Sequence, residues 1–139
     1  MVGKYRLIDH TADFGIHVAG KDPETLFANA AYALFDLITD IRILEGNNRK
    51  ELTVTGADWP DLMINWLREI LFLWNGKEIL VKKADIISIF ENKLSAAVFY
   101  DAYDPDRHAI KLEIKAVTYH QVQVTSGPSG WEGRVIFDI

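Results

Sequence analysis

The segment Asp9-His10-Thr11-Ala12-Asp13 is the first in the chain with more polar groups than a small fold requires. In an extended chain Asp9, Thr11 and Asp13 point to one side and His10 to the other, because successive strand side chains alternate. Two carboxylates and a hydroxyl on one side form hard oxygen donors suited to Mg²⁺, Ca²⁺ or Mn²⁺. The competing interpretation is a turn held by side-chain hydrogen bonds to the backbone, which the spacing alone favours.

A second group of anions lies at the end of the sequence. The last residues are Asp138 and Ile139, directly after a predicted strand, so the Asp138 side chain and the terminal carboxylate are one residue apart. Two such anions can chelate a hard cation or enter the metal site of a partner. A strand that simply ends there, with Asp138 solvated, explains the pattern equally well.

The third candidate segment is residues 113–120. Strand alternation places Glu113, Lys115, Val117 and Tyr119 on one face. Lys115 among these neighbours can hold a carboxylate or a phosphate by its charge. The commoner role of such a lysine is to protect an edge strand from aggregation.

Other chemical patterns are weak or missing in the sequence. Asp101, Asp104 and Asp106 resemble part of a calcium loop, but no glycine and glutamate follow at the spacing of an EF-hand, so 104–106 is predicted as a hairpin turn. There is no cysteine, which excludes disulfides and thiolate chemistry. The sequence has no phosphate-binding loop, dinucleotide fingerprint, zinc site or nucleophile elbow.

Two helices are predicted to position these groups. Each begins with an N-cap aspartate, Asp22 or Asp58, and a proline within two residues. Apolar residues recur at helical spacing as far as Ile38 in the first helix and Trp74 in the second, with Asn75-Gly76 as the second C-cap. The aromatic-rich stripe of the second helix favours core packing over a cofactor slot.

The remaining periodic segments are predicted strands. They are residues 4–8, 14–18, 50–55, 79–90, 94–103, 109–119, 120–125 and 131–138, with a tight turn at 91–93. Strands at both ends and two helices between them predict an α+β two-layer sandwich: a mixed, mostly antiparallel sheet with two main helices packed on one face.

Composition limits the function classes. The 139 residues are 49% hydrophobic and 25% charged, which predicts one globular domain, residues 1–139. The formal net charge of -5 disfavours direct binding to nucleic acid. The N-terminus lacks the apolar stretch of a signal peptide, and no apolar run is long enough to span a bilayer, so a cytoplasmic location is expected and no membrane association.

Together these segments resemble the archease family. The resemblance covers essentially the whole chain and is most specific in the strings DHTAD (9–13) and IKAVTYH (114–120). Weaker matches support it: Gly15, Asn65-Trp66-Leu67, Leu71-Phe72-Leu73-Trp74 and the closing Ile136-Phe137-Asp138-Ile139.

The resemblance implies a helper protein that is not itself an enzyme. Archease-like proteins stimulate RtcB, a ligase of tRNA splicing and RNA repair, by promoting its guanylylation with GTP and so allowing multiple turnovers. The resemblance further implies a bound divalent metal, with Ca²⁺ expected ahead of Mg²⁺ or Mn²⁺. Its ligands would be Asp13, Asp138 and the carboxylate of Ile139. Lys115 would be the functional lysine, with Asp9 and His10 as further residues for the partner.

Two other function classes compete with this interpretation. One is a chaperone or modulator of a tRNA-modifying enzyme, such as a tRNA methyltransferase, that uses the same acidic surface. The other is a metal-dependent hydrolase built on the same carboxylates, which ranks last because no general base is evident beside them.

Overall fold

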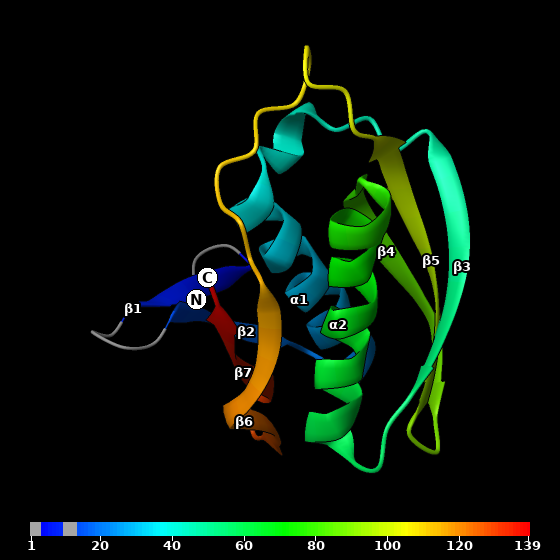
Figure 1. Ribbon diagram of the computed structural model, residues 1–139. Helices are drawn as coiled ribbons and strands as arrows, with labels where there is room; N and C mark the ends of the chain where they lie inside the picture. The colour runs from blue at the N-terminus through cyan, green and yellow to red at the C-terminus, as the bar shows by residue number, and fades with distance from the viewer. Residues whose placement is uncertain (1–3, 10–13) are drawn as a thin grey trace.

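The computed structural model describes residues 4–9 and 14–139. In chain order its elements are β1 (Tyr5–Asp9), β2 (Phe14–Gly20), α1 (Pro23–Ile38), the 3₁₀ helix η1 (Ile41–Ile43), β3 (Asn48–Thr55), α2 (Trp59–Lys77), β4 (Ile79–Phe90), β5 (Lys93–Ala102), β6 (Ala116–Gly127) and β7 (Gly130–Asp138) (Figure 1). No helix formed by these described residues is long and apolar enough to cross a membrane.

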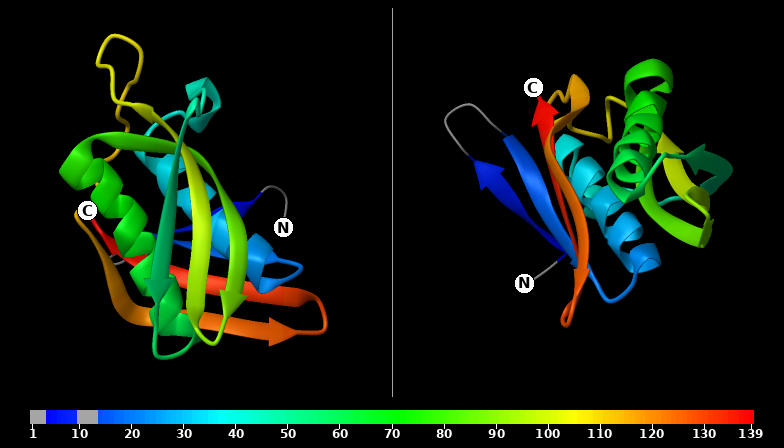
Figure 2. Two further views of the ribbon diagram at one scale, coloured as in Figure 1. Left: turned by 90° about the vertical axis from the view of Figure 1, so that its right-hand side faces the viewer. Right: turned by 90° about the horizontal axis from the view of Figure 1, so that it is seen from below.

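The two helices lie between two antiparallel sheets (Figure 2). One sheet has the strand order β1-β2-β7-β6 and the other β3-β5-β4. Helix α1 packs against β2 and β4, whereas α2 packs against β6 on one side and β3 on the other. The α+β class is confirmed, and the helices cover one face of each sheet. The expected single mixed sheet is wrong, because the strands divide between two sheets that are both antiparallel.

The buried surface of α1 explains why two sheets are needed. Besides the apolar residues that recur at helical spacing, Ala33 and Leu37 are also buried. The apolar surface of the helix is therefore wider than one sheet can cover. The two helices meet at Trp66 of α2, which is fully buried and donates its indole N–H to the carbonyl oxygen of Phe27 (N···O 3.0 Å). Core packing of Trp66 is thereby confirmed.

Both helix starts are confirmed by their capping bonds. The Asp22 carboxylate accepts a hydrogen bond from the backbone N–H of Thr25 (2.7 Å), and Asp58 accepts one from Asp61 (2.9 Å). The Asp61 carboxylate in turn accepts from the backbone N–H of Ala57 (2.8 Å), which satisfies a further donor at this end.

The end of α2 differs from the expectation. The helix runs through Asn75 and Gly76 to Lys77, and the C-cap is Glu78, which adopts the left-handed conformation (φ 54°). Gly76 has a packing role instead, because a Cβ there would lie 2.5 Å from the ring of Phe72.

The strand boundaries are confirmed in the 79–102 hairpin and differ further along the chain. Residues 109–115 were expected to be extended, but the strand begins at Ala116 and continues as β6 to Gly127, with irregular pairing between Thr118 and Gln123. Before Lys115 the backbone bonds to helices rather than to a neighbouring strand, and Lys115 itself bonds to Asp138 at the end of β7. The Lys111 N–H donates to the carbonyl of Ile38 (2.7 Å), and Asn75 Nδ2 donates to that of Ile114 (3.1 Å).

Candidate functional site at the C-terminal corner

The end of β7, one of the three segments that the sequence singled out, lies beside another, residues 113–120. Asp138 pairs with Ala116 in register, and the backbone N–H of Lys115 donates to the carbonyl oxygen of Asp138 (2.8 Å). On the other side of β7, Phe137 pairs with Phe14, the residue that follows Asp13 in the chain. We call Phe14, Lys115, Ala116, Asp138 and Ile139 the C-terminal corner; in Figure 1 it lies at the end marked C.

The polar side chains of the C-terminal corner face solvent. The side chains of Asp138, Ile139 and Lys115 are exposed. Among the residues that the structure describes, neither the Asp138 carboxylate nor the Lys115 ammonium group takes part in a hydrogen bond or ion pair. A solvated carboxylate and an ammonium group on adjoining strands can each bind an ion of opposite charge.

The structure describes the first segment only at its start. His10, Thr11 and Asp13 lie outside the described residues, and only the backbone of Asp9, at the end of β1, is described. The expected clustering of Asp13 with Asp138 and Ile139 therefore stays a prediction. Within residues 4–9 and 14–139, no group of three or more His, Cys, Asp or Glu side chains could hold a metal ion.

The strand of the third segment begins later than expected, at Ala116, and the chain there borders α2. Lys115 and Val117 border a hollow of about 270 Å³ against α2, which Arg68, Phe72 and Asn75 also line. The Arg68 guanidinium donates to the carbonyl oxygen of Val117 from Nε (3.2 Å) and Nη2 (3.1 Å). The Arg68 guanidinium is thus already bonded to the backbone, whereas the Lys115 ammonium group has no such bond within the described residues.

Tyr119 continues this face toward the start of α2. Its hydroxyl donates to the Asp61 carboxylate (2.6 Å), and the Arg68 guanidinium lies over its ring, 4.7 Å from the centroid. The hydrogen bond from Tyr119, followed by that from the Ala57 N–H, lowers the pKa of Asp61, and the same bond to Asp61 raises the pKa of Tyr119. Tyr119 therefore ties β6 to the N-terminal end of α2, which holds the strand that follows Lys115.

The comparisons with known proteins give the family. The family model described as "Archease protein family (MTH1598/TM1083)" matches residues 5–139. The chain belongs to the archease family. The curated protein archease of Methanosarcina barkeri is 34% identical over 140 residues, which cover 98% of this chain and 96% of that protein.

Solved structures of archeases have the same fold. A protein of Methanobacterium thermoautotrophicum has a solution structure that superposes with a TM-score of 0.81 at 27% identity, covering 97% of this chain and 98% of that one. The Thermotoga maritima structure, titled an archease and possible chaperone, has a TM-score of 0.65 at 20% identity and covers 96% of each chain. The second likeness is evidence for the fold alone.

The C-terminal corner has donor types that suit the metal implied by the archease resemblance. Asp138 supplies an unpaired, exposed carboxylate, and the neighbouring Ile139 would supply the terminal one. Carboxylate oxygens are the preferred ligands of Ca²⁺ and Mg²⁺. Two carboxylates from one strand end are too few ligands for such an ion, so a third carboxylate, such as that of Asp13, would be needed as well.

A buried ionisable pair that the sequence did not predict lies far from this corner. The Asp101 carboxylate accepts from the backbone N–H groups of Glu45 (3.0 Å) and Gly46 (2.7 Å), and it lies 3.4 Å from Nε2 of His108. His108 Nδ1 accepts from the N–H of Asp104 (2.9 Å). The three aspartates have different roles: Asp101 binds the 45–46 loop, whereas Asp104 and Asp106 lie in a turn. The hairpin expected at 104–106 is wrong, because irregular chain rather than a strand follows this turn.

Burial and hydrogen bonding act in opposite directions on Asp101. Burial disfavours its charged form, but the N–H groups of Glu45 and Gly46, with His108, outweigh that effect and hold the pKa of Asp101 below its usual value. Only the close spacing of a histidine and three aspartates in 101–108 hinted at this pair. Its role is structural, because both side chains are buried and bind neighbouring loops.

Proposed function

We propose that this archease-family chain is a non-enzymatic cofactor that activates an RtcB-type RNA ligase in the cytoplasm. It would promote guanylylation of the ligase and so allow each ligase molecule to join many RNA ends. Family membership supports this proposal, and the observation that carries it is the C-terminal corner. There, Lys115 is bonded to the strand end that bears Asp138, and both side chains are exposed and unpaired within the described residues.

A divalent metal would be held by Asp13, Asp138 and the terminal carboxylate of Ile139. Support for this assignment comes from the pairing of Phe14 with Phe137, which brings the residue after Asp13 beside the end of the chain. Ca²⁺ is the expected ion, with Mg²⁺ and Mn²⁺ as alternatives that the same donors accept. When bound, the ion would supply positive charge next to phosphate oxygens.

Lys115 would bind an anionic group of the ligase complex beside that metal. Its backbone N–H is already used by Asp138, so the position of its Cα is fixed by the sheet while its ammonium group remains free. Asp9 and His10, in the first segment, would contribute to the surface that the ligase contacts. A lysine ammonium is a compact, flexible charge that suits a phosphate.

A multiple-turnover RNA-joining assay tests the proposal. A purified RtcB-type ligase from the same source would be incubated with GTP, Mn²⁺ and RNA that carries a 2′,3′-cyclic phosphate end and a 5′-hydroxyl end, with and without a substoichiometric amount of this protein. Product well beyond one equivalent per ligase, seen only when the protein is present, is the expected result. Equal product in both reactions would refute activation of that ligase.

A second candidate function is a chaperone or modulator of a tRNA-modifying enzyme such as a tRNA methyltransferase. The acidic balance of the chain, with a net charge of -5, favours it, because an acidic surface can shield such an enzyme from RNA. Affinity capture with the tagged protein, followed by identification of the bound enzyme, separates the two. Recovery of a methyltransferase without the ligase would favour this candidate.

A further inference from the structure

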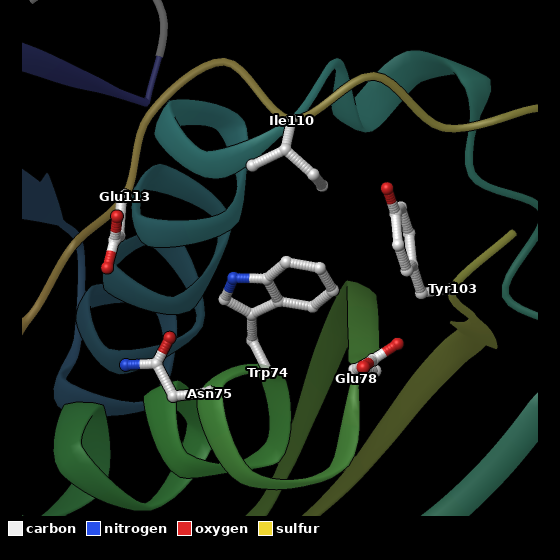
Figure 3. A pocket seen from close by; sticks show the side chains of 6 residues that line it. All are labelled: Trp74, Asn75, Glu78, Tyr103, Ile110 and Glu113. Carbon is white, nitrogen blue, oxygen red and sulfur yellow. The ribbon is translucent and has the colours of Figure 1, made fainter. Parts of the chain in front are cut away.

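A second hollow, of about 390 Å³, lies between the last turn of α2 and the irregular chain after β5. Its volume falls within the range of about 300–1,000 Å³ that is usual for small ligand sites. We call it the aromatic hollow; it is lined by Trp74, Asn75, Glu78, Tyr103, Ile110 and Glu113 (Figure 3).

The charge of the aromatic hollow is negative and unbalanced. Glu78 and Glu113 are exposed, and neither carboxylate has a hydrogen bond or ion pair with a described residue. Cations of the adjoining segments are directed elsewhere: Lys77 lies over the ring of Phe72 (5.9 Å), Arg107 pairs with Glu45, and Lys111 lines a different hollow with Asp40. The last turn of α2 adds the negative end of its helix dipole.

Two aromatic rings form the floor of the aromatic hollow. Trp74 and Tyr103 meet edge to face, with centroids 5.1 Å apart and ring planes at 84°, and both rings are half-buried. In Figure 3 the indole of Trp74 lies in the middle of the lining residues, with Glu78 and Glu113 on opposite sides of it. Aromatic faces next to carboxylates attract a cation that also has apolar surface.

Hydrogen bonds fix the walls of the hollow in place. The N–H of Tyr103 donates to the carbonyl of Glu78 (3.0 Å), and the Asn75 side chain donates to the carbonyl of Ile114 (3.1 Å). Both ends of the irregular chain are therefore attached to the last turn of α2. A site held this way loses little conformational entropy when it is filled.

We propose that the aromatic hollow binds the guanidinium group of an arginine side chain presented by a partner protein. A guanidinium group stacks on aromatic rings and bonds to carboxylates through its planar set of donors, which an ammonium group does less well. Asn75 borders both the aromatic hollow and the hollow beside Lys115, so the two hollows adjoin. An extended protein segment can contact both at once, which is why we assign the arginine to a protein partner. A chain lying along residues 113–117 would meet an acidic hollow and then a basic one. This site is distinct from the metal proposed at the C-terminal corner.

A direct binding experiment tests the proposal without the ligase. A capped Gly-Arg-Gly peptide would be titrated into the ¹⁵N-labelled full-length protein, with the indole N–H signal of Trp74 as the reporter. We expect saturable shifts confined to the hollow. Glu78→Gln and Glu113→Gln should each weaken binding about two- to fivefold, the range for exposed charge pairs. Glu69→Gln, an exposed α2 glutamate outside the hollow, is the matched control and should leave the affinity unchanged.

Three further probes decide the chemistry. A citrulline peptide has the same shape without the charge, so equal binding would overturn the proposal. Tighter binding of a lysine peptide would overturn the choice of guanidinium. Tighter binding of free agmatine than of the arginine peptide would mean that a small cation, not a protein segment, occupies the hollow. All the glutamate variants alter exposed side chains and should therefore stay folded. An unchanged melting temperature would verify this for each variant.

Discussion

The backbone N–H of Lys115 donates a hydrogen bond to the carbonyl oxygen of Asp138, with an N···O distance of 2.8 Å. This bond joins the last residue of β7 to the chain immediately before β6. It fixes the backbone of both residues and leaves both side chains in solvent. Substitutions of these side chains should therefore affect binding while preserving the fold.

The Asp138 carboxylate is expected to be essential for metal binding and ligase stimulation. Asp138→Asn keeps the shape of the side chain but removes the charge that a hard cation needs. We expect loss of Ca²⁺ binding by calorimetry and loss of multiple turnover, with Asp13→Asn giving the same result. Asp138 is exposed and unpaired among the described residues. The free energy of unfolding of the Asp138→Asn protein should therefore differ from that of the parent by less than about 0.5 kcal/mol.

Asp85→Asn is the control for this pair, since Asp85 is an exposed aspartate on the other sheet. It should retain both Ca²⁺ binding and stimulation. Normal stimulation by Asp138→Asn would contradict a role of this carboxylate in activation. Unfolding of Asp13→Asn or Asp138→Asn would instead assign a structural role to that aspartate.

Lys115→Gln should separate function from stability in a similar way. The variant keeps the backbone bond to Asp138 and removes only the free ammonium charge. We expect stimulation of the ligase to fall at least tenfold, because a charge-assisted phosphate contact contributes about 1.5–3 kcal/mol. Lys93→Gln, at an exposed lysine of the β4–β5 hairpin, should stimulate normally. A Lys115→Gln protein as active as the parent would exclude the ammonium group from the mechanism.

The close approach of β2 and β7 at Gly15 predicts a fold effect that extends to the C-terminal corner. A Cβ at Gly15 would lie 2.2 Å from the carbonyl oxygen of Val135, so Gly15→Ala must push the two strands apart. We expect a loss of stability of about 1–3 kcal/mol or more in urea unfolding and faster amide exchange in β7. Gly127→Ala is the control, because nothing lies within 4 Å of its added Cβ. Equal stability of the two variants would contradict the tight packing at Gly15.

Local signals in the sequence were sufficient for the helix starts and insufficient for features that depend on distant residues. Asp22 and Asp58 cap helices through bonds only three residues away, which spacing reveals. Residues 109–114 have strand-like alternation, but the backbone of Lys111 and Ile114 bonds to Ile38 and Asn75, which lie on helices. The division of the strands into two sheets likewise depends on packing around α1 that no local pattern encodes.

The candidate site could likewise be predicted from the sequence only in part. The residue types at Lys115 and Asp138 could be singled out from the sequence, whereas the hydrogen bond between them required the pairing of β6 with β7. The α2 C-cap at Glu78 was missed because asparagine and glycine are the usual signals for a left-handed residue. The bond from the Gly46 amide to the Asp101 carboxylate spans 55 residues, which is beyond any local pattern.

Asp101 gives the last prediction, a pH-dependent stability. Its buried carboxylate accepts two backbone hydrogen bonds, and Asp101→Asn should cost about 1.5–3 kcal/mol at pH 7, the range for bonds to charged groups. The folded-state pKa lies below the unfolded value, so this stabilisation is complete above the unfolded pKa and is lost as the pH falls through the folded one. Urea unfolding of both proteins should give a difference that is constant between pH 5 and pH 7. The difference should shrink below pH of about 4, and a constant difference down to pH 2 would contradict ionisation of Asp101 as its source.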